Sequence, residues 1–89
     1  MKHHATDAFW KCYGALPPSV RQLADKNFGL LRANPDQPSL QLKSVGRFWS
    51  ARVGLSWRAL AVKDTESETL VWFWIGSHAE YDQLVGRKR

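Results

Sequence analysis

The strongest constraint on the fold is a strand–turn–strand pattern in residues 47–62. Residues of RFWSARV alternate between two sides of an extended strand, and SWRALAV resumes the alternation after a turn. The intervening Gly54-Leu55-Ser56 is typical of a tight hairpin. This hairpin places Arg52 opposite Arg58. Because like charges that face each other across a sheet repel, we interpret the pair as a site for an anion between two guanidinium groups.

Two further segments are expected to extend this sheet. Leucines and polar residues alternate from Leu40 to Val45, before a turn at Gly46. The run TLVWFWI, residues 69–75, follows a polar KDTESE turn and is apolar on both faces. Such a run is typical of a central strand that is covered by helices on one side and packed on the other.

The N-terminal part of the chain shows the periodicity of two helices. Thr6 can cap a first helix in which apolar residues recur at helical spacing. Pro17-Pro18 ends that helix and suits the first turn of a second one. Asn34-Pro35 ends the second helix, because the residue before a proline avoids helical angles. Only MKHHAT precedes the first helix, and we expect this segment to be too short for a strand.

A short helix is also expected near the C-terminus. Ser77, followed three residues later by Glu80, is the signature of a capping box, so this helix begins at Gly76-Ser77. The predicted fold is therefore α+β, with two N-terminal helices on a mostly antiparallel sheet of about four strands, and a short C-terminal helix. The 89 residues are expected to form a single domain, residues 1–89.

The composition indicates the cellular compartment that we expect for the chain. The one cysteine, Cys12, excludes an internal disulfide, and we interpret it as a small buried hydrophobe. Five tryptophans supply much of the apolar surface, and we expect most of them to be structural. The N-terminus lacks the apolar core of a signal peptide. The longest apolar run, LVWFWI, is far below the roughly 20 residues of a membrane span, so we expect a cytoplasmic protein.

The net charge of +5 is distributed unevenly. Between Gln37 and Lys63 the sequence has five bases and no acid, whereas acids collect in the KDTESE turn that follows. This polarity is expected for a polyanionic partner, either nucleic acid or an acidic protein, although an ordinary solvated face of a basic protein would have the same composition. Lys43 and Arg47 are the candidates for binding RNA phosphates.

Four side chains are candidates for catalysis: Arg52, Arg58, His78 and Tyr81. Two arginines can hold a scissile phosphate and stabilise a pentacovalent transition state. Histidine transfers protons near neutral pH, and tyrosine donates a hydrogen bond or stacks on a base. Structural roles compete with these: capping or core packing for the histidine, and packing for the tyrosine.

The other polar residues after the last strand have simpler interpretations. Glu80 is explained by the capping box, and Asp82 by the helix dipole. The sequence has no CxxC or HExxH spacing and no glycine-rich phosphate loop, so we predict neither a metal nor a cofactor.

The order and spacing of ARVGLSWRALAV and VWFWIGSHAEYDQL resemble the RelE/ParE superfamily of bacterial toxins. ALPPSVRQLADKNFGLLRANPDQPSLQLKSV resembles the helical half of these proteins. In the resemblance, Arg58 matches an arginine that contacts the scissile phosphate and Arg52 a basic position one strand earlier. His78 falls where a catalytic basic residue follows the glycine at the strand end, and Tyr81 matches a C-terminal tyrosine in type. Ser50 stands where a second lysine could stand.

The resemblance implies the toxin of a type II toxin–antitoxin pair. RelE-like members are metal-independent endoribonucleases that cut messenger RNA on the ribosome, where the 2′-hydroxyl attacks the adjacent phosphate. ParE-like members share the fold but act on DNA gyrase, and for that alternative the tail Gly86-Arg87-Lys88-Arg89 could be a contact surface. A third alternative is a catalytically inert relative that only binds a partner. In each case we expect an acidic antitoxin that covers the basic groove.

Overall fold

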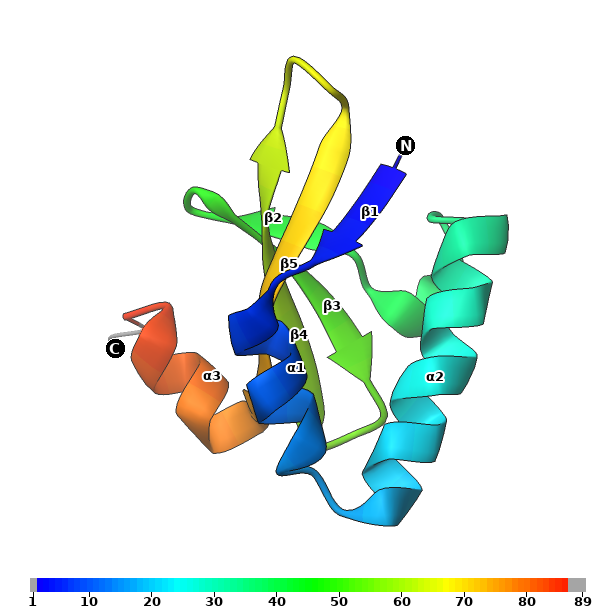
Figure 1. Cartoon of the computed structure of the whole chain (residues 1–89), viewed down its shortest axis with the longest axis vertical. Coiled ribbons are helices and arrows are strands. Elements are labelled where there is room, and N and C mark those ends of the chain that lie inside the picture. The colour runs from blue at the N-terminus through cyan, green and yellow to red at the C-terminus, as the bar shows by residue number, and fades with distance from the viewer. Residues whose placement is uncertain (1, 87–89) are drawn as a thin grey trace.

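The computed structural model describes residues 2–86, so three residues of the basic tail, Arg87 to Arg89, lie outside the described part. Within residues 2–86 the chain forms five strands, three α-helices and one short 3₁₀ helix (Figure 1). In chain order these are β1 (Lys2–Ala5), α1 (Asp7–Gly14), α2 (Pro18–Ala33), the 3₁₀ helix η1 (Pro38–Leu40), β2 (Lys43–Val45), β3 (Phe48–Val53), β4 (Trp57–Asp64), β5 (Thr69–Ser77) and α3 (His78–Leu84).

The five strands form one sheet in the order β1-β5-β4-β3-β2. Strands β2 to β5 are joined by consecutive antiparallel hairpins, and β1 lies parallel to β5 at one edge. The predicted α+β architecture of two N-terminal helices, a mostly antiparallel sheet and a short C-terminal helix is confirmed. The strand TLVWFWI is interior, as predicted, although β4 takes the middle position.

The prediction that MKHHAT is too short for a strand was wrong. Residues Lys2–Ala5 pair with β5 from Thr69 to Trp72. The side chains add to this pairing, because the indole N–H of Trp72 donates a hydrogen bond of 3.1 Å to Nδ1 of His3. A four-residue strand has little local signal, and its formation depends on a partner strand at the far end of the sequence.

The prediction of a strand from residue 40 was also wrong in its first half. Residues 38–40 form a 3₁₀ turn that Pro38 begins, and Gln41 follows with a left-handed φ of +46°. The strand itself is only three residues long, Lys43–Val45. Leu40, which is 1% exposed, is a core residue because this turn brings it inward.

Helix α1 begins after Thr6 and α2 lies between Pro17 and Asn34, as predicted, whereas α1 ends at Gly14, before the predicted Pro17-Pro18. The hydroxyl oxygen of Thr6 accepts a hydrogen bond of 3.2 Å from the backbone N–H of Phe9 and caps α1. Pro17 and Asn34 flank α2. The two helices are tied together by the hydroxyl of Tyr13, which donates a 2.7 Å hydrogen bond to Asp25.

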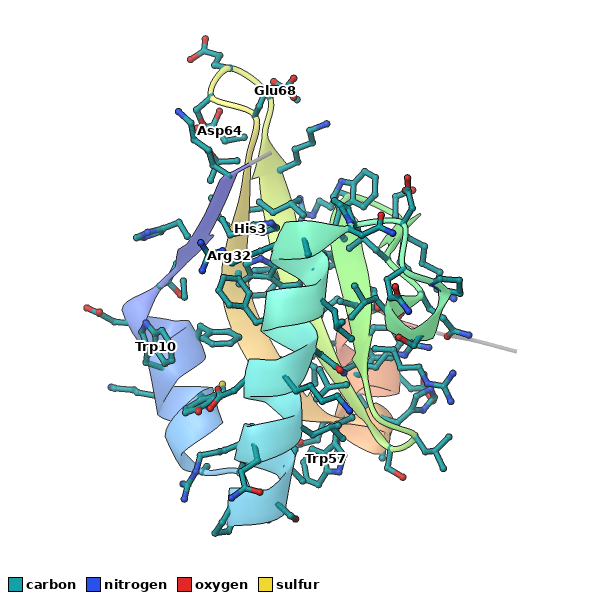
Figure 2. All side chains as sticks on the ribbon, turned by 90° about the vertical axis from the view of Figure 1, so that its right-hand side faces the viewer. His3, Trp10, Arg32, Trp57, Asp64 and Glu68 are labelled. Carbon is teal, nitrogen blue, oxygen red and sulfur yellow. The ribbon has the colours of Figure 1, made fainter. Side chains whose placement is uncertain are left out.

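The hydrophobic core lies between α1, α2 and one face of the sheet, and α3 lies apart from them beside the other face (Figures 1 and 2). Ala59 and Ala61 of β4 contribute to this core. Side chains alternate along a strand, so Arg58 and Leu60 face the other side. Trp72 is buried, whereas Trp10 on α1 is 53% exposed and contacts Phe9 and Tyr13 of its own helix.

Candidate functional site

The β3–β4 hairpin has the predicted register. Arg52 is the Cα partner of Arg58, and the turn between them contains Gly54 with φ +69°. This backbone conformation favours glycine. A Cβ on Gly54 would also lie 2.5 Å from a methyl carbon of Leu23 on α2. The turn therefore packs against α2 while the two arginines extend from the paired strands.

Arg58 is buried, with 8% exposure, and its guanidinium group is bonded from two sides. Nη1 donates to the hydroxyl oxygen of Ser50 at 3.3 Å, and Nη2 donates to the amide oxygen of Gln41 at 3.1 Å. The ring of Tyr81 covers the group, with 5.3 Å between the guanidinium carbon and the ring centroid. Burial of a cation is costly unless it is paired and hydrogen-bonded, and these three contacts offset part of that cost.

Arg52 has a separate environment. Its Nε donates a hydrogen bond of 3.1 Å to the carbonyl oxygen of Gly54 in its own turn. Each of the two facing arginines thus has oxygen acceptors from the protein, which reduces the cost of placing like charges on paired strands. The pairing of the two residues is confirmed, and an anion between them stays a prediction.

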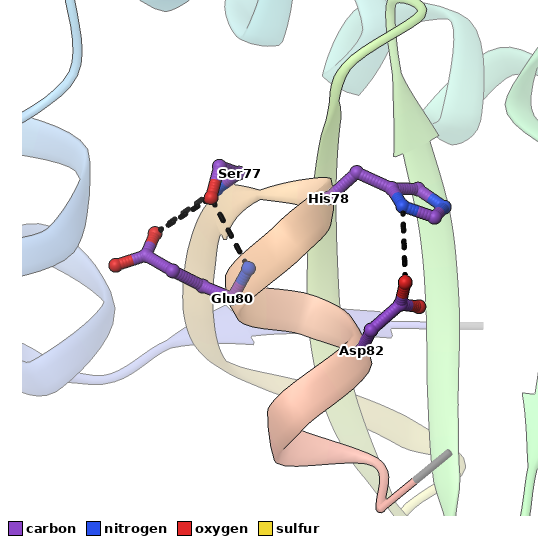
Figure 3. Close-up of polar contacts among 4 residues, drawn as sticks. All are labelled: Ser77, His78, Glu80 and Asp82. Carbon is purple, nitrogen blue, oxygen red and sulfur yellow. Dashed lines mark hydrogen bonds and ion pairs between the residues drawn. The ribbon is translucent and has the colours of Figure 1, made fainter. Parts of the chain in front are cut away.

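Helix α3 starts where the capping box predicted. The hydroxyl oxygen of Ser77 accepts from the backbone N–H of Glu80 at 3.2 Å, and the Glu80 carboxylate accepts from the backbone N–H of Ser77 (Figure 3). The first residue of the helix, His78, donates its backbone N–H to the carbonyl oxygen of Ser56 at 2.7 Å. This bond fastens the start of α3 to the turn that carries the two arginines.

His78, Tyr81 and Asp82 lie on one face of α3. The rings of His78 and Tyr81 are 5.6 Å apart between centroids. Nδ1 of His78 is 3.5 Å from a carboxylate oxygen of Asp82, with side-chain exposures of 44% and 40% (Figure 3). A carboxylate next to Nδ1 favours a proton on that nitrogen, which leaves Nε2 as the acceptor. The imidazole is therefore oriented and open to solvent, as proton transfer requires.

The two predicted phosphate-binding residues lie at different distances from Arg58. Lys43 is exposed and pairs with Ser50, so its side chain is on the same face of the sheet as the guanidinium group of Arg58. Arg47 is exposed in the turn between β2 and β3 and contacts Phe48, with 5.6 Å between its guanidinium carbon and the ring centroid. The structure thus brings Arg58, Tyr81 and His78 into contact, with Lys43 beside them, and leaves Arg47 at the other end of β3.

Two residues of this site were not predicted from the sequence. Ser50 precedes Arg52 by two positions, so strand alternation places both on one face, and this signal could have identified it. Gln41 had no such signal, because its contact with Arg58 depends on the turn that follows η1.

The acidic residues of the KDTESE turn are remote from this site, whereas Glu80 and Asp82 lie on α3 beside it. Figure 2 shows Asp64 and Glu68 at the tip of the β4–β5 turn, at the opposite end of the molecule from Trp57, which precedes Arg58. The polarised distribution of charge that the sequence indicated is therefore also present in space. Among residues 2–86 there is no group of histidine, cysteine and carboxylate side chains that could hold a metal ion.

The opposite face of the sheet has a different character. A cavity of about 340 Å³ lies between α1, α2 and the sheet, and aromatic and aliphatic side chains line most of it, including Phe9, Phe28 and Trp72. His3 lies at its edge. Burial lowers the pKa of His3, and the positive charge of Arg32 lowers it further. Neither His3 nor Arg32 belongs to the Arg58 cluster, the group formed by Arg58 with Gln41, Ser50 and Tyr81.

No helix in the described part of the chain is long and apolar enough to cross a membrane. Neither a protein-family model nor a curated protein sequence matches the chain. Solved structures do match. The RelBE2 toxin–antitoxin complex from Mycobacterium tuberculosis is 22% identical with a TM-score of 0.65, over 86% of this chain and 96% of the matched chain.

A mutant of the Escherichia coli toxin RelE, in its free state, superimposes with a TM-score of 0.67 at 15% identity, over 96% of this chain and 90% of that chain. The archaeal RelE–RelB complex from Pyrococcus horikoshii gives a TM-score of 0.62 at 13% identity, over 85% of this chain and 92% of that chain. These similarities extend over nearly the whole of each chain. The protein has the fold of the RelE toxins.

Proposed function

We propose that this protein is the toxin of a type II toxin–antitoxin pair and that it cleaves messenger RNA without a metal ion. The observation that carries the proposal is the contact of Arg58, Tyr81 and His78 on one face of a RelE-type sheet. Metal-independent phosphodiester cleavage needs a cation that stabilises the developing charge and a group that transfers protons, and Arg58 and the partly exposed His78 are of these two kinds.

In the proposed reaction the ribose 2′-oxygen attacks the adjacent phosphorus, and the bond from phosphorus to the 5′-oxygen breaks. The products are a 2′,3′-cyclic phosphate and a free 5′-hydroxyl. Arg58 stabilises the charge that develops on the phosphate oxygens. His78 transfers one proton through Nε2, either from the 2′-hydroxyl or to the leaving 5′-oxygen, and solvent water takes or supplies the other proton. Lys43 binds a neighbouring phosphate, and Arg52 and Arg47 extend the basic surface.

The position of Tyr81 adds a requirement. Its ring covers the guanidinium group of Arg58, so an RNA phosphate reaches that group only when the ring moves aside. A nucleobase that stacks on the displaced ring replaces the contact that Arg58 loses, because base–aromatic stacking contributes about 1–3 kcal/mol per base.

Mapping of RNA 5′ ends by primer extension tests the nuclease proposal. Expression of the wild-type protein should produce new ends within translated messages. Arg58→Lys keeps a positive charge but loses the bidentate geometry, and His78→Gln removes proton transfer. Both should reduce the new ends at least tenfold, whereas Arg32→Ala, on the helical side of the sheet, should not. The absence of new ends with the wild-type protein would overturn the proposal, and inhibition of DNA supercoiling in its place would identify a ParE-like action.

The proposed partner is an acidic antitoxin. Two of the matched structures are of toxins bound to antitoxins, from M. tuberculosis and P. horikoshii. In this chain the exposed bases Lys43 and Arg47 and the net charge of +5 favour an acidic segment. The affinity for such a partner should fall as salt rises, because salt screens charges at an exposed interface. Titration calorimetry with the product of an adjacent acidic reading frame measures this dependence, and an affinity that is independent of salt would contradict it.

A further inference from the structure

The guanidinium group of Arg58 is held by three different elements. Ser50 of β3 and Gln41 of the segment after η1 accept its hydrogen bonds, and Tyr81 of α3 covers it. Ser50 is fully buried and Tyr81 is 3% exposed, so both are also packing residues. Gln41 is exposed, so burial does not account for its place in the cluster.

The backbone of Gln41 is in an unfavourable conformation. Its φ of +46° lies in the left-handed region, which is unfavourable for a residue with a Cβ. Leu40, directly before it, is buried in the core, and the backbone N–H of Gln41 closes the 3₁₀ turn on the carbonyl oxygen of Pro38 at 3.2 Å. The strained turn is thus anchored, and from it the side chain of Gln41 reaches Arg58.

The chemistry of the contact is also specific. Within residues 2–86 the hydrogen-bond acceptors of the Arg58 guanidinium are a hydroxyl and an amide oxygen, and neither is a carboxylate. A carboxylate would neutralise the cation, whereas neutral acceptors fix its orientation and leave its charge for an anion. Two of the five guanidinium N–H groups take part in these bonds, so donors remain for a phosphate.

We propose that Gln41 is a positioning residue that fixes the orientation of the Arg58 guanidinium group for an RNA phosphate. The inference rests on the proposed nuclease function for its substrate, but the restraint on Arg58 can be measured without any RNA. Gln41 acts through Arg58 and keeps the guanidinium plane aligned before the phosphate arrives. Such pre-alignment lowers the barrier to reaction, because the group does not have to reorganise in the transition state.

Nitrogen-15 NMR of the Arg58 side chain measures the restraint directly. In the wild-type protein the two Nη groups should give separate signals, because hydrogen bonds to Gln41 and Ser50 slow rotation about the Nε–Cζ bond. In Gln41→Ala the signals should merge. Gln41→Gly removes the same amide and also relieves the left-handed strain, so it should merge the signals while raising the melting temperature relative to Gln41→Ala. Gln22→Ala, an exposed glutamine of α2, is the matched control and should keep the signals separate.

Cleavage kinetics then separate positioning from binding. Gln41→Ala should reduce kcat roughly tenfold and leave KM within about twofold, because a loosely held guanidinium still attracts the phosphate. Gln41→Glu should keep the Nη signals separate but weaken the binding of an oligoribonucleotide with a 2′-deoxy cleavage site at least tenfold, because the carboxylate neutralises Arg58.

Two outcomes distinguish the failure of this inference from the failure of the proposed function. Separate Nη signals in both Gln41→Ala and Gln41→Gly would overturn the positioning role, whether or not RNA is cleaved. Merged signals in these variants, combined with no cleavage by the wild-type protein, would support the restraint on Arg58 and overturn the nuclease.

Discussion

The contact of Arg58 with Tyr81 predicts a large coupling energy between two buried side chains. The guanidinium carbon lies 5.3 Å from the ring centroid, and the residues are 8% and 3% exposed. A cation over an aromatic ring contributes about 0.5–1 kcal/mol at an exposed site and about 2 kcal/mol when both partners are removed from water. We therefore expect a coupling of about 2 kcal/mol for this pair.

A second arginine–aromatic pair in the same protein provides a matched control. Arg32 lies 5.7 Å from the ring centroid of Phe28, which is almost the same separation. Phe28 is 43% exposed, and Arg32 is exposed as well. Water weakens the electrostatic attraction of this pair, so its coupling should be about 0.5 kcal/mol. Since the distances are similar, the difference between the couplings measures the effect of burial.

Double-mutant cycles measure both couplings. The first cycle combines Arg58→Met with Tyr81→Leu, and the second combines Arg32→Met with Phe28→Leu. Each of the four substitutions places an unbranched or branched apolar side chain at the position. Arg58→Met removes the same hydrogen bonds whether or not Tyr81 is present, so their loss cancels in the coupling energy. Urea unfolding, followed by tryptophan fluorescence, gives the free energies. A coupling for the buried pair that does not exceed that of the exposed pair would refute the reasoning.

Three other predictions concern stability. Burial lowers the pKa of His3 in the folded protein below its usual 6.5. As the pH falls, the unfolded chain therefore takes up this proton before the folded protein does. The contribution of His3 to stability is present above about pH 6.5 and is lost as the pH falls through the folded pKa. His3→Asn keeps an acceptor but does not titrate, and it should flatten the pH dependence of the unfolding free energy; an unchanged slope would contradict this. A Cβ at Gly76 would lie 2.5 Å from the Trp74 ring, so Gly76→Ala should lower the unfolding free energy by about 1–3 kcal/mol. At Gly29 an added Cβ meets no atom within 4 Å outside its own helix backbone, so Gly29→Ala should raise the unfolding free energy by about 0.5–1 kcal/mol in the same urea titrations. Equal effects of the two alanines would show that the Trp74 ring moves to make room for the Cβ at position 76. Ser77→Ala removes the cap of α3 and should cost about 1 kcal/mol in thermal unfolding, whereas Ser77→Thr should cost much less.

Short-range patterns were sufficient to predict most of the elements. The cap at Thr6, the prolines around α2 and the capping box at Ser77 act within one helical turn, so their effect can be derived from adjacent residues. The register of Arg52 with Arg58 is of the same kind, because a three-residue turn leaves little freedom in how the two strands pair.

Predictions failed where a segment depends on distant residues. Lys2–Ala5 forms a strand because the edge of β5 is available to it, and no pattern within MKHHAT indicates that this edge is available. Residues 38–40 form a 3₁₀ turn that brings Leu40 into the core, although the alternation of apolar and polar residues is equally compatible with a strand. For such weakly biased segments, tertiary packing overrides local propensity.

The same division applies to the candidate site. The types of its residues, their charges and their places on strands and a helix follow from the sequence, because these depend on composition and local periodicity. The surroundings of Arg58 do not follow from it. Gln41, Ser50 and Tyr81 meet the guanidinium group only after the hairpin, the 3₁₀ turn and α3 have packed together. Hydrogen bonds and ring contacts act over a few ångströms, so the distances that decide whether Arg58 is aligned, covered or accessible exist only in the folded chain.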